Sequence, residues 1–240
     1  MKLDGLRDKQ LPYVNELRST FKQHQCHVIN APPGAGKTAI AAYLAQSFAN
    51  AGMKTVFAAP YVTLVDQTWV RFQEYGMDEP SVIWQKDPRF DERKLIHIAS
   101  ADTLICKDEV LPENTRVLIW DECHIKRADL LQHIHDNPDL KVIGLSATPY
   151  PDWMGQTYTN LIKPFTTRDF INDSLLTPFE IYMPNLGENR ERMESIKVRQ
   201  GDYAVGPAAA AMMDAKLVGD IVGNWLKNAV DDRGNHLQTI

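Results

Sequence analysis

The sequence has few cysteines. Cys26, Cys106 and Cys123 are the three in the 240-residue chain, and they form neither a CxxC pair nor an even set. Disulfide-stapled domains carry paired cysteines, so we expect no disulfide framework. A reducing compartment is the corresponding expectation.

The sequence also lacks a long hydrophobic run. No apolar stretch approaches the roughly 18 residues that a membrane-spanning helix needs, and the N-terminal residues contain no apolar core of signal-peptide length. We therefore expect a soluble, cytoplasmic protein with no membrane partner. No apolar interface stands out in the sequence, which favours a monomer.

Excess positive charge is missing as well. Lysine and arginine total 26 against 31 aspartate and glutamate, giving a net charge of −5. This excludes a protein that holds nucleic acid by bulk positive charge, although a local basic groove is compatible with it. Apolar residues make up 44% and charged residues 24%, which is typical of a globular protein with a buried core.

Short apolar runs recur along the first part of the chain and predict β-strands. None alternates strictly between apolar and polar residues, which is typical of strands buried on both faces. The segments between them are long enough for crossover helices. The pattern predicts an α/β fold, a doubly wound parallel sheet with helices on both faces. The predicted strands cover residues 27–30, 54–58, 95–99, 116–120 and 141–145.

The pattern changes after about residue 164. We expect residues 1–165 to form one domain and residues 166–235 to form a linker and helical segment. Residues 183–202 are rich in charged residues and are interrupted by proline and glycine, which is typical of a linker. Residues 208–230 have a helix-prone composition. The last residues, 236–240, look like the opening of a strand of a further domain.

The strongest chemical signal is the run APPGAGKT at residues 31–38, which follows a predicted strand and opens a predicted helix. Glycines at these positions let backbone N–H groups turn toward phosphate oxygens, and the helix N-terminus adds a favourable dipole. Ala31 stands where the strict phosphate-loop pattern has glycine. The predicted phosphate-binding residues are Pro33, Gly34, Ala35, Gly36, Lys37 and Thr38. Lys37 would reach the β- and γ-phosphates, and Thr38 would bind Mg²⁺.

A pair of acids forms the second signal. Asp121 and Glu122 directly follow a predicted strand, which places them at the carboxyl edge of the sheet beside the phosphate loop. Asp121 would help to hold Mg²⁺, and Glu122 would orient and deprotonate an attacking water.

A third signal is a pair of small hydroxyl residues. Ser146 and Thr148 follow another predicted strand. We expect these hydroxyls to hydrogen-bond His124 and to link the nucleotide site to another surface.

At this point the motifs resemble a known family. GAGKT, DECH and SAT, in this order, resemble motifs I, II and III of the superfamily 2 helicases and translocases of the DExH group. Residues 6–10 resemble the element before motif I, in which a glutamine reads adenine, but Lys9 replaces the usual aromatic residue. Residues 144–149, 167–171 and 175–178 resemble the branch of transcription-repair and phage recombination helicases. The resemblance covers about residues 3–185.

The resemblance implies a RecA-like P-loop motor domain that binds ATP and Mg²⁺ and tracks a nucleic-acid backbone. Gln10 would read adenine, and Arg7 would either stack on the base or form a structural salt bridge. DNA is favoured over RNA by the branch alone. Contacts to the backbone rather than to bases imply low sequence specificity. The implied nucleic-acid contacts are Pro60, Thr63, Ser100, Asp102 and Thr103.

Members of this family also have a second RecA-like domain, in cis or in trans, whose arginines complete the ATP site. Residues 236–240 would then be its first strand. Loss of such an arginine typically costs a factor of ~10³–10⁵ in rate, so we expect the chain alone to bind ATP and to hydrolyse it poorly.

Two alternatives stay open. One is a double-stranded DNA translocase or restriction motor fragment that does not unwind. The other is a nucleotide-dependent nucleic-acid-binding module without turnover of its own.

Overall fold

The structure is a computed structural model that describes residues 6–84, 87–105, 111–179, 198–199, 202–203, 221–230 and 234. The chain divides into two compact units, Met1–Thr177 and Pro178–Ile240. In the second unit the described elements are the antiparallel strands β8 (Val198–Arg199) and β9 (Asp202–Tyr203) and the helix α11 (Ile221–Asn228). The strand expected at residues 236–240 lies outside the described residues.

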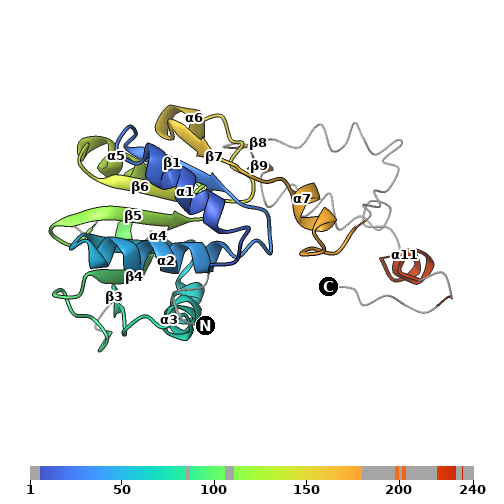
Figure 1. Ribbon diagram of the computed structural model, residues 1–240, viewed down its shortest axis with the longest axis horizontal. Helices are drawn as coiled ribbons and strands as arrows, with labels where there is room; N and C mark the ends of the chain where they lie inside the picture. The colour runs from blue at the N-terminus through green and yellow to red at the C-terminus, as the bar shows by residue number, and fades with distance from the viewer. Residues whose placement is uncertain are drawn as a thin grey trace. The chain divides into compact units, whose positions relative to one another are not determined.

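The first unit alternates strands and helices along the chain (Figure 1). Its strands are β1 (Cys26–Asn30), β2 (Lys54–Ala59), β3 (Ser81–Val82), β4 (Ile96–Ser100), β5 (Thr115–Asp121), β6 (Lys141–Ser146) and β7 (Asn160–Ile162). Its helices are α1 (Leu11–Thr20), α2 (Lys37–Asn50), the 3₁₀ turn η1 (Val62–Leu64), α3 (Val65–Glu74), α4 (Ala101–Ile105), α5 (Ala128–Asp136), α6 (Met154–Thr157) and α7 (Thr167–Asn172).

All seven strands of the first unit join one sheet in the order β3-β4-β2-β5-β6-β1-β7. Every neighbouring pair is parallel. The carboxyl ends of the strands therefore lie at one edge of the sheet, where the loops that follow them gather. The predicted parallel α/β fold is confirmed, and β1, β2, β4, β5 and β6 match the predicted strands to within one residue at each end.

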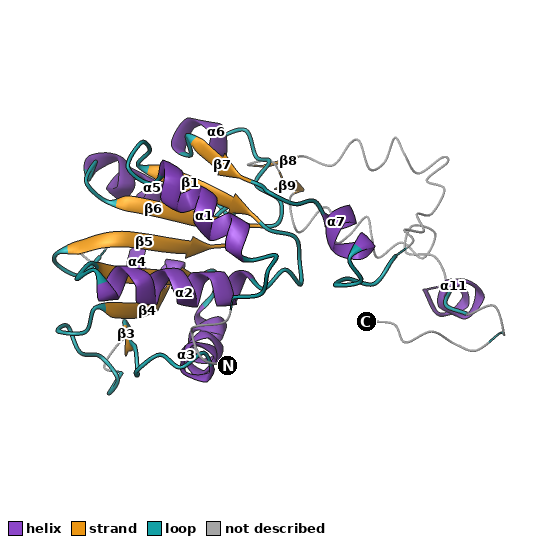
Figure 2. Ribbon diagram, in the orientation of Figure 1, coloured by secondary structure: helices purple, strands orange, loops and turns teal. Residues whose placement is uncertain are grey.

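Helices cover both faces of the sheet, as Figure 2 shows. Successive residues of β5 explain why: Val117 and Ile119 belong to one apolar cluster, and Leu118 and Trp120 belong to the other. The first cluster includes buried residues of α1, α2, α3 and α7, and the second includes those of α4, α5 and α6. A strand buried on both faces needs apolar residues at consecutive positions, so strict alternation is missing from the sequence.

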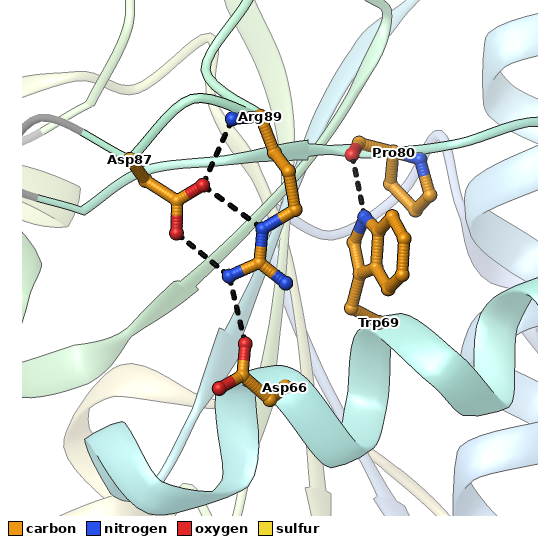
Figure 3. A network of polar contacts seen from close by, with 5 residues as sticks. All are labelled: Asp66, Trp69, Pro80, Asp87 and Arg89. Carbon is orange, nitrogen blue, oxygen red and sulfur yellow. Dashed lines mark hydrogen bonds and ion pairs between the residues drawn. The ribbon is translucent and has the colours of Figure 1, made fainter.

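The sheet ends at the short strand β3, where the loop that follows is tied to α3 by Arg89 (Figure 3). Its guanidinium donates to both carboxylate oxygens of Asp87, at 2.9 and 2.6 Å, and to Asp66 of α3 at 2.7 Å. It also lies 5.1 Å from the ring centroid of Trp69, whose indole N–H donates to the carbonyl of Pro80 at 3.0 Å. Hydrogen bonds from Arg89 lower the pKa of Asp87.

The first unit continues past the region where the sequence pattern changes. Thr166 and Asp169 form a capping box at the start of α7, and the buried Phe170 packs into the first apolar cluster. Within the described residues, no helix has the length and apolar character required to cross a membrane.

Candidate functional site

The phosphate loop connects β1, which lies between β6 and β7 in the sheet, to α2. Gly34 and Gly36 have φ angles of 79° and 84°, in the left-handed region that favours glycine. Gly36 is the N-cap of α2, so Lys37 and Thr38 occupy the first turn of that helix. A glycine-rich turn that leads into a helix N-terminus presents backbone N–H groups to an anion, which fits the predicted binding of phosphate.

Gln10 holds this loop from the side. Its side chain is buried; the amide oxygen accepts from the Arg7 backbone N–H, and the amide nitrogen donates to the Ala35 carbonyl, both at 3.0 Å. A Cβ at Gly36 would lie 2.3 Å from the Gln10 amide nitrogen. In this structure, both ends of the amide that the family resemblance assigns to adenine are engaged by the protein.

A cavity of about 540 Å³ adjoins Gln10, a size that small ligands occupy. Lys9 forms an ion pair with Asp173 and stands 4.1 Å from the ring centroid of Phe165. The cavity is lined by Arg7, Asp8, Lys9, Gln10, Gly34, Ala35, Phe170, Asp173 and Leu175. Sequence reasoning identified Arg7 and Gln10 but missed the three lining residues that the segment around α7 contributes.

The acid pair lies at the end of β5. The Lys37 ammonium is 3.2 Å from a carboxylate oxygen of Glu122, so the phosphate loop and the acidic segment are in direct contact. Glu122 has a φ of 48°, an uncommon backbone conformation for a residue with a side chain. Burial, assisted by the charge of Glu122 and opposed by Lys37, raises the pKa of Asp121 to about 6.

A polar chain continues from Glu122 to the end of β6. The His124 Nδ1 lies 3.3 Å from the second Glu122 carboxylate oxygen and 2.9 Å from the Ser146 hydroxyl. That hydroxyl also accepts the Thr148 backbone N–H at 3.0 Å, while the Ser146 carbonyl accepts the Ala31 N–H at 3.1 Å. The structure thus contains the expected His124–Ser146 contact, whereas Thr148 joins through its backbone.

Two of these residues fit a magnesium ion. The Thr38 hydroxyl and the Asp121 carboxylate are hard oxygen donors, which Mg²⁺ prefers. Asp121 is partly buried, and burial is the main cause of its raised pKa. The described residues contain no group of three or more His, Cys, Asp or Glu side chains placed to hold a metal. This donor set therefore fits an ion that nucleotide phosphates and water also ligate.

The residues implied in nucleic-acid contact lie at or just after the carboxyl ends of β2 and β4, at the same edge of the sheet. Thr63 is exposed in η1, whereas Pro60 is buried. Ser100 is fully buried, and its hydroxyl bonds the Thr103 hydroxyl at 2.8 Å and accepts the Thr103 N–H at 3.0 Å. Asp102 accepts a hydrogen bond from Arg127 at 2.8 Å.

Comparisons with solved structures agree with this fold. The UvsW helicase from bacteriophage T4 matches with a TM-score of 0.54 and 18% identity, over 66% of this chain and 60% of that chain. A nuclease-deletion mutant of the type ISP restriction-modification enzyme LlaGI, solved in complex with a DNA substrate mimic, matches with a TM-score of 0.55 and 16% identity, over 95% of this chain and 25% of that chain. The fold of the first unit is therefore the RecA-like fold of helicase structures.

Comparisons with sequences place the chain in a family. A 51.5 kDa protein of a Lactococcus phage (isolate 7-9) is 24% identical over 207 residues, which is 84% of this chain and 41% of the relative. The chain thus spans about two fifths of the length of that relative. Residues 4–151 match the family described as "Type III restriction enzyme, res subunit". Because this match covers more than half of the chain, the protein belongs to that family of superfamily 2 helicase-type domains.

Proposed function

We propose that the chain is the N-terminal motor domain of a DNA-dependent ATPase, in which ATP hydrolysis is coupled to movement along the nucleic acid. One observation carries the proposal: the Lys37 ammonium of the phosphate loop lies 3.2 Å from Glu122 at the end of β5. The two groups that this chemistry needs, a phosphate-binding cation and a carboxylate base, thus meet at one edge of the sheet.

The side chains divide the chemistry. Lys37 binds the β- and γ-phosphates, and their negative charge competes with Glu122 for the ammonium. Glu122, released from that ion pair, accepts a hydrogen bond from the attacking water and takes its proton. Thr38 and Asp121 hold Mg²⁺, which neutralises phosphate charge when bound. His124 contacts both Glu122 and Ser146, so a shift of the Glu122 carboxylate would change the contact that His124 makes at the end of β6.

DNA is the proposed partner, bound through its backbone at Thr63 and at the turn after β4. Two structural relatives support it, since one is a helicase and the other was solved in complex with a DNA substrate mimic. A second RecA-like domain, in cis or in trans, would supply the arginines that complete the ATP site.

Two other functions compete with a helicase motor. The family description and the likeness to a type ISP enzyme favour a restriction-type translocase that moves on duplex DNA without unwinding it. The Lys37–Glu122 ion pair is also compatible with a nucleotide-dependent binding module that does not turn over.

Nucleotide binding and hydrolysis test the proposal together. We expect Mg²⁺-dependent ATP binding that Lys37→Ala abolishes, and slow hydrolysis that DNA stimulates. Glu122→Gln should lower the hydrolysis rate by about 10²-fold or more while leaving ATP bound, because it removes a general base. The measurements are the affinity for a fluorescent ATP analogue and phosphate release with and without duplex DNA.

The outcomes separate the candidates. ATP binding with a rate equal to that of Glu122→Gln would favour the binding module. Failure to bind ATP in the presence of Mg²⁺ would contradict the proposal as a whole.

A further inference from the structure

The turn after β4 contains an acid where nucleic-acid contacts are expected. Asp102 lies in the first turn of α4, next to Ser100 at the end of β4. An ionised carboxylate only accepts hydrogen bonds and repels a phosphate. Asp102 therefore does not bind a nucleic-acid backbone by itself, and a cation is needed if this turn is to do so.

The cation that lies beside Asp102 is Arg127. Its Nε donates to the Asp102 carboxylate at 2.8 Å, and its Nη1 donates to the Lys126 carbonyl at 3.4 Å. Among the residues that the structure describes, no acceptor is recorded for the two Nη2 hydrogens. The Arg127 side chain is 17% exposed and that of Asp102 is 43% exposed. Arg127 is therefore oriented by the acid and still has donors to offer.

The other polar groups of this turn are already used. The hydroxyls of Ser100 and Thr103 bond each other and are buried. Leu104 of α4 and Leu130 of α5 are fully buried in the same apolar cluster, so the helix that carries Asp102 and the helix that Arg127 precedes are both packed against the sheet. Among the described residues of this turn, Asp102 and Arg127 form a charged pair that reaches the solvent.

We propose that Arg127 binds a backbone phosphate of the nucleic acid, with Asp102 as the positioning residue that aims its guanidinium. The inference rests on the proposed function and names a contact within it. A planar guanidinium that is held by one carboxylate can give its remaining N–H groups to phosphate oxygens. Arg127 also lies three residues after His124, in the same connection between β5 and α5 that carries Glu122.

The test compares Arg127→Ala with Arg93→Ala in the full chain. Arg93 is a matched control because it also pairs with an aspartate through Nε, at 3.0 Å from Asp91, but precedes β4 and so belongs to the opposite edge of the sheet. The readout is the affinity for a labelled duplex DNA of unrelated sequence, measured across a salt series. The plot of log K against log salt has a negative slope, and each lost phosphate contact should make it shallower by about 0.9.

We expect Arg127→Ala to weaken DNA binding roughly tenfold at about 50 mM salt and to lower the salt slope by about one, equally for unrelated sequences. Arg93→Ala should change neither quantity. A slope and an affinity for Arg127→Ala equal to those of Arg93→Ala would overturn the assignment.

A double variant excludes an indirect effect. Arg127→Ala also exposes the charge of Asp102, which by itself would repel DNA. In Asp102→Ala/Arg127→Ala this repulsion is gone, and we expect binding to remain weak because the phosphate contact is still missing. Recovery of wild-type affinity in the double variant would overturn the proposal. Melting temperatures of all variants identify a purely structural loss, which would leave the salt slope unchanged.

The test also separates this inference from the proposed function. If Arg127→Ala binds DNA like the wild type while Glu122→Gln still abolishes DNA-stimulated hydrolysis, the Arg127 assignment fails and the motor stands. If the wild-type chain does not bind DNA at low salt, both fail.

Discussion

At the scale of single residues, Gly144 in β6 is dictated by its neighbours. A Cβ at this position would lie 2.5 Å from the Cys123 sulfur and 2.9 Å from the Tyr158 ring. Cys123 directly follows Glu122, so the space beside Gly144 is filled by the acidic segment. Burial raises the pKa of the Cys123 thiol to about 12. The thiol therefore stays protonated, and Cys123 acts as a small core residue.

We predict that Gly144→Ala lowers the free energy of unfolding by about 1–3 kcal/mol, because a methyl group is forced into a filled space. Gly155→Ala is the control, since nothing lies within 4 Å of a Cβ at Gly155. Adding Cys123→Ala to Gly144→Ala should recover part of the loss. Urea unfolding measures all four chains, and equal stability of the two single glycine variants would contradict the prediction.

The sequence was sufficient to predict those site residues that belong to short, recognisable motifs. Lys37 and Glu122 were assigned from a loop and a strand end, and the structure brings their charges together. Pairings between distant side chains were not predictable in this way. Arg127 gives no signal in its own segment, because its partner Asp102 comes from another strand end. Likewise, Asp173 meets Lys9 only in the folded chain.

At the scale of elements, strands buried on both faces were predictable because their whole length must be apolar. The strands β3 and β7 were missed, since they have two and three residues and too little pattern to read. β3 is instead held by its surroundings. Its Ser81 hydroxyl accepts the Asp91 N–H at 2.9 Å, and Arg89 ties the following loop to α3.

The Asp87–Arg89 pair makes the stability of this edge depend on pH. Hydrogen bonds from Arg89 lower the pKa of folded Asp87 below its ordinary value of 3.8. A carboxylate with a lowered folded pKa stabilises the fold above the unfolded pKa, and this stability is lost as the pH falls through the folded pKa. We therefore predict that Asp87→Asn unfolds at lower urea than the wild type at pH 7, and that the gap closes below about pH 4.

Urea unfolding of both chains across this pH range measures the gap. Asp136→Asn serves as a comparison on α5. The pKa of Asp136 is also lowered, but mainly by a hydrogen bond from the neutral Gln132 rather than by an arginine. A gap between wild type and Asp87→Asn that stays constant from pH 7 to pH 3.5 would show that the ion pair is not its cause.

At the scale of the whole molecule, the compact first unit contains every residue placed at the candidate site. It extends to Thr177, beyond the boundary expected at residue 165 from the change in sequence pattern. The segment between residues 165 and 177 packs beside the phosphate loop and lines the cavity next to it. Phe170 and Leu175 line the cavity beside Gln10, and a Cβ at Gly34 would lie 2.6 Å from Leu176.

We therefore predict that a chain cut after Thr177 keeps the ATP affinity of the full chain to within about twofold, whereas a chain cut after Phe165 binds ATP at least tenfold more weakly. The longer piece retains the cavity wall and the buried Phe170. The shorter piece exposes the apolar cluster that Phe170 fills, and loss of a buried phenylalanine side chain typically costs about 3–5 kcal/mol.

Phe170→Ala in the full chain separates the effect of losing the Phe170 side chain from the effect of removing the whole segment after Phe165. If it reproduces the affinity of the shorter piece, α7 acts through this side chain. Titration of a fluorescent ATP analogue against each chain, with melting temperatures to confirm folding, provides the measurement. Equal ATP affinity of the two pieces would mean that the segment around α7, and the part of the cavity beside Gln10 that this segment lines, contribute nothing to nucleotide binding.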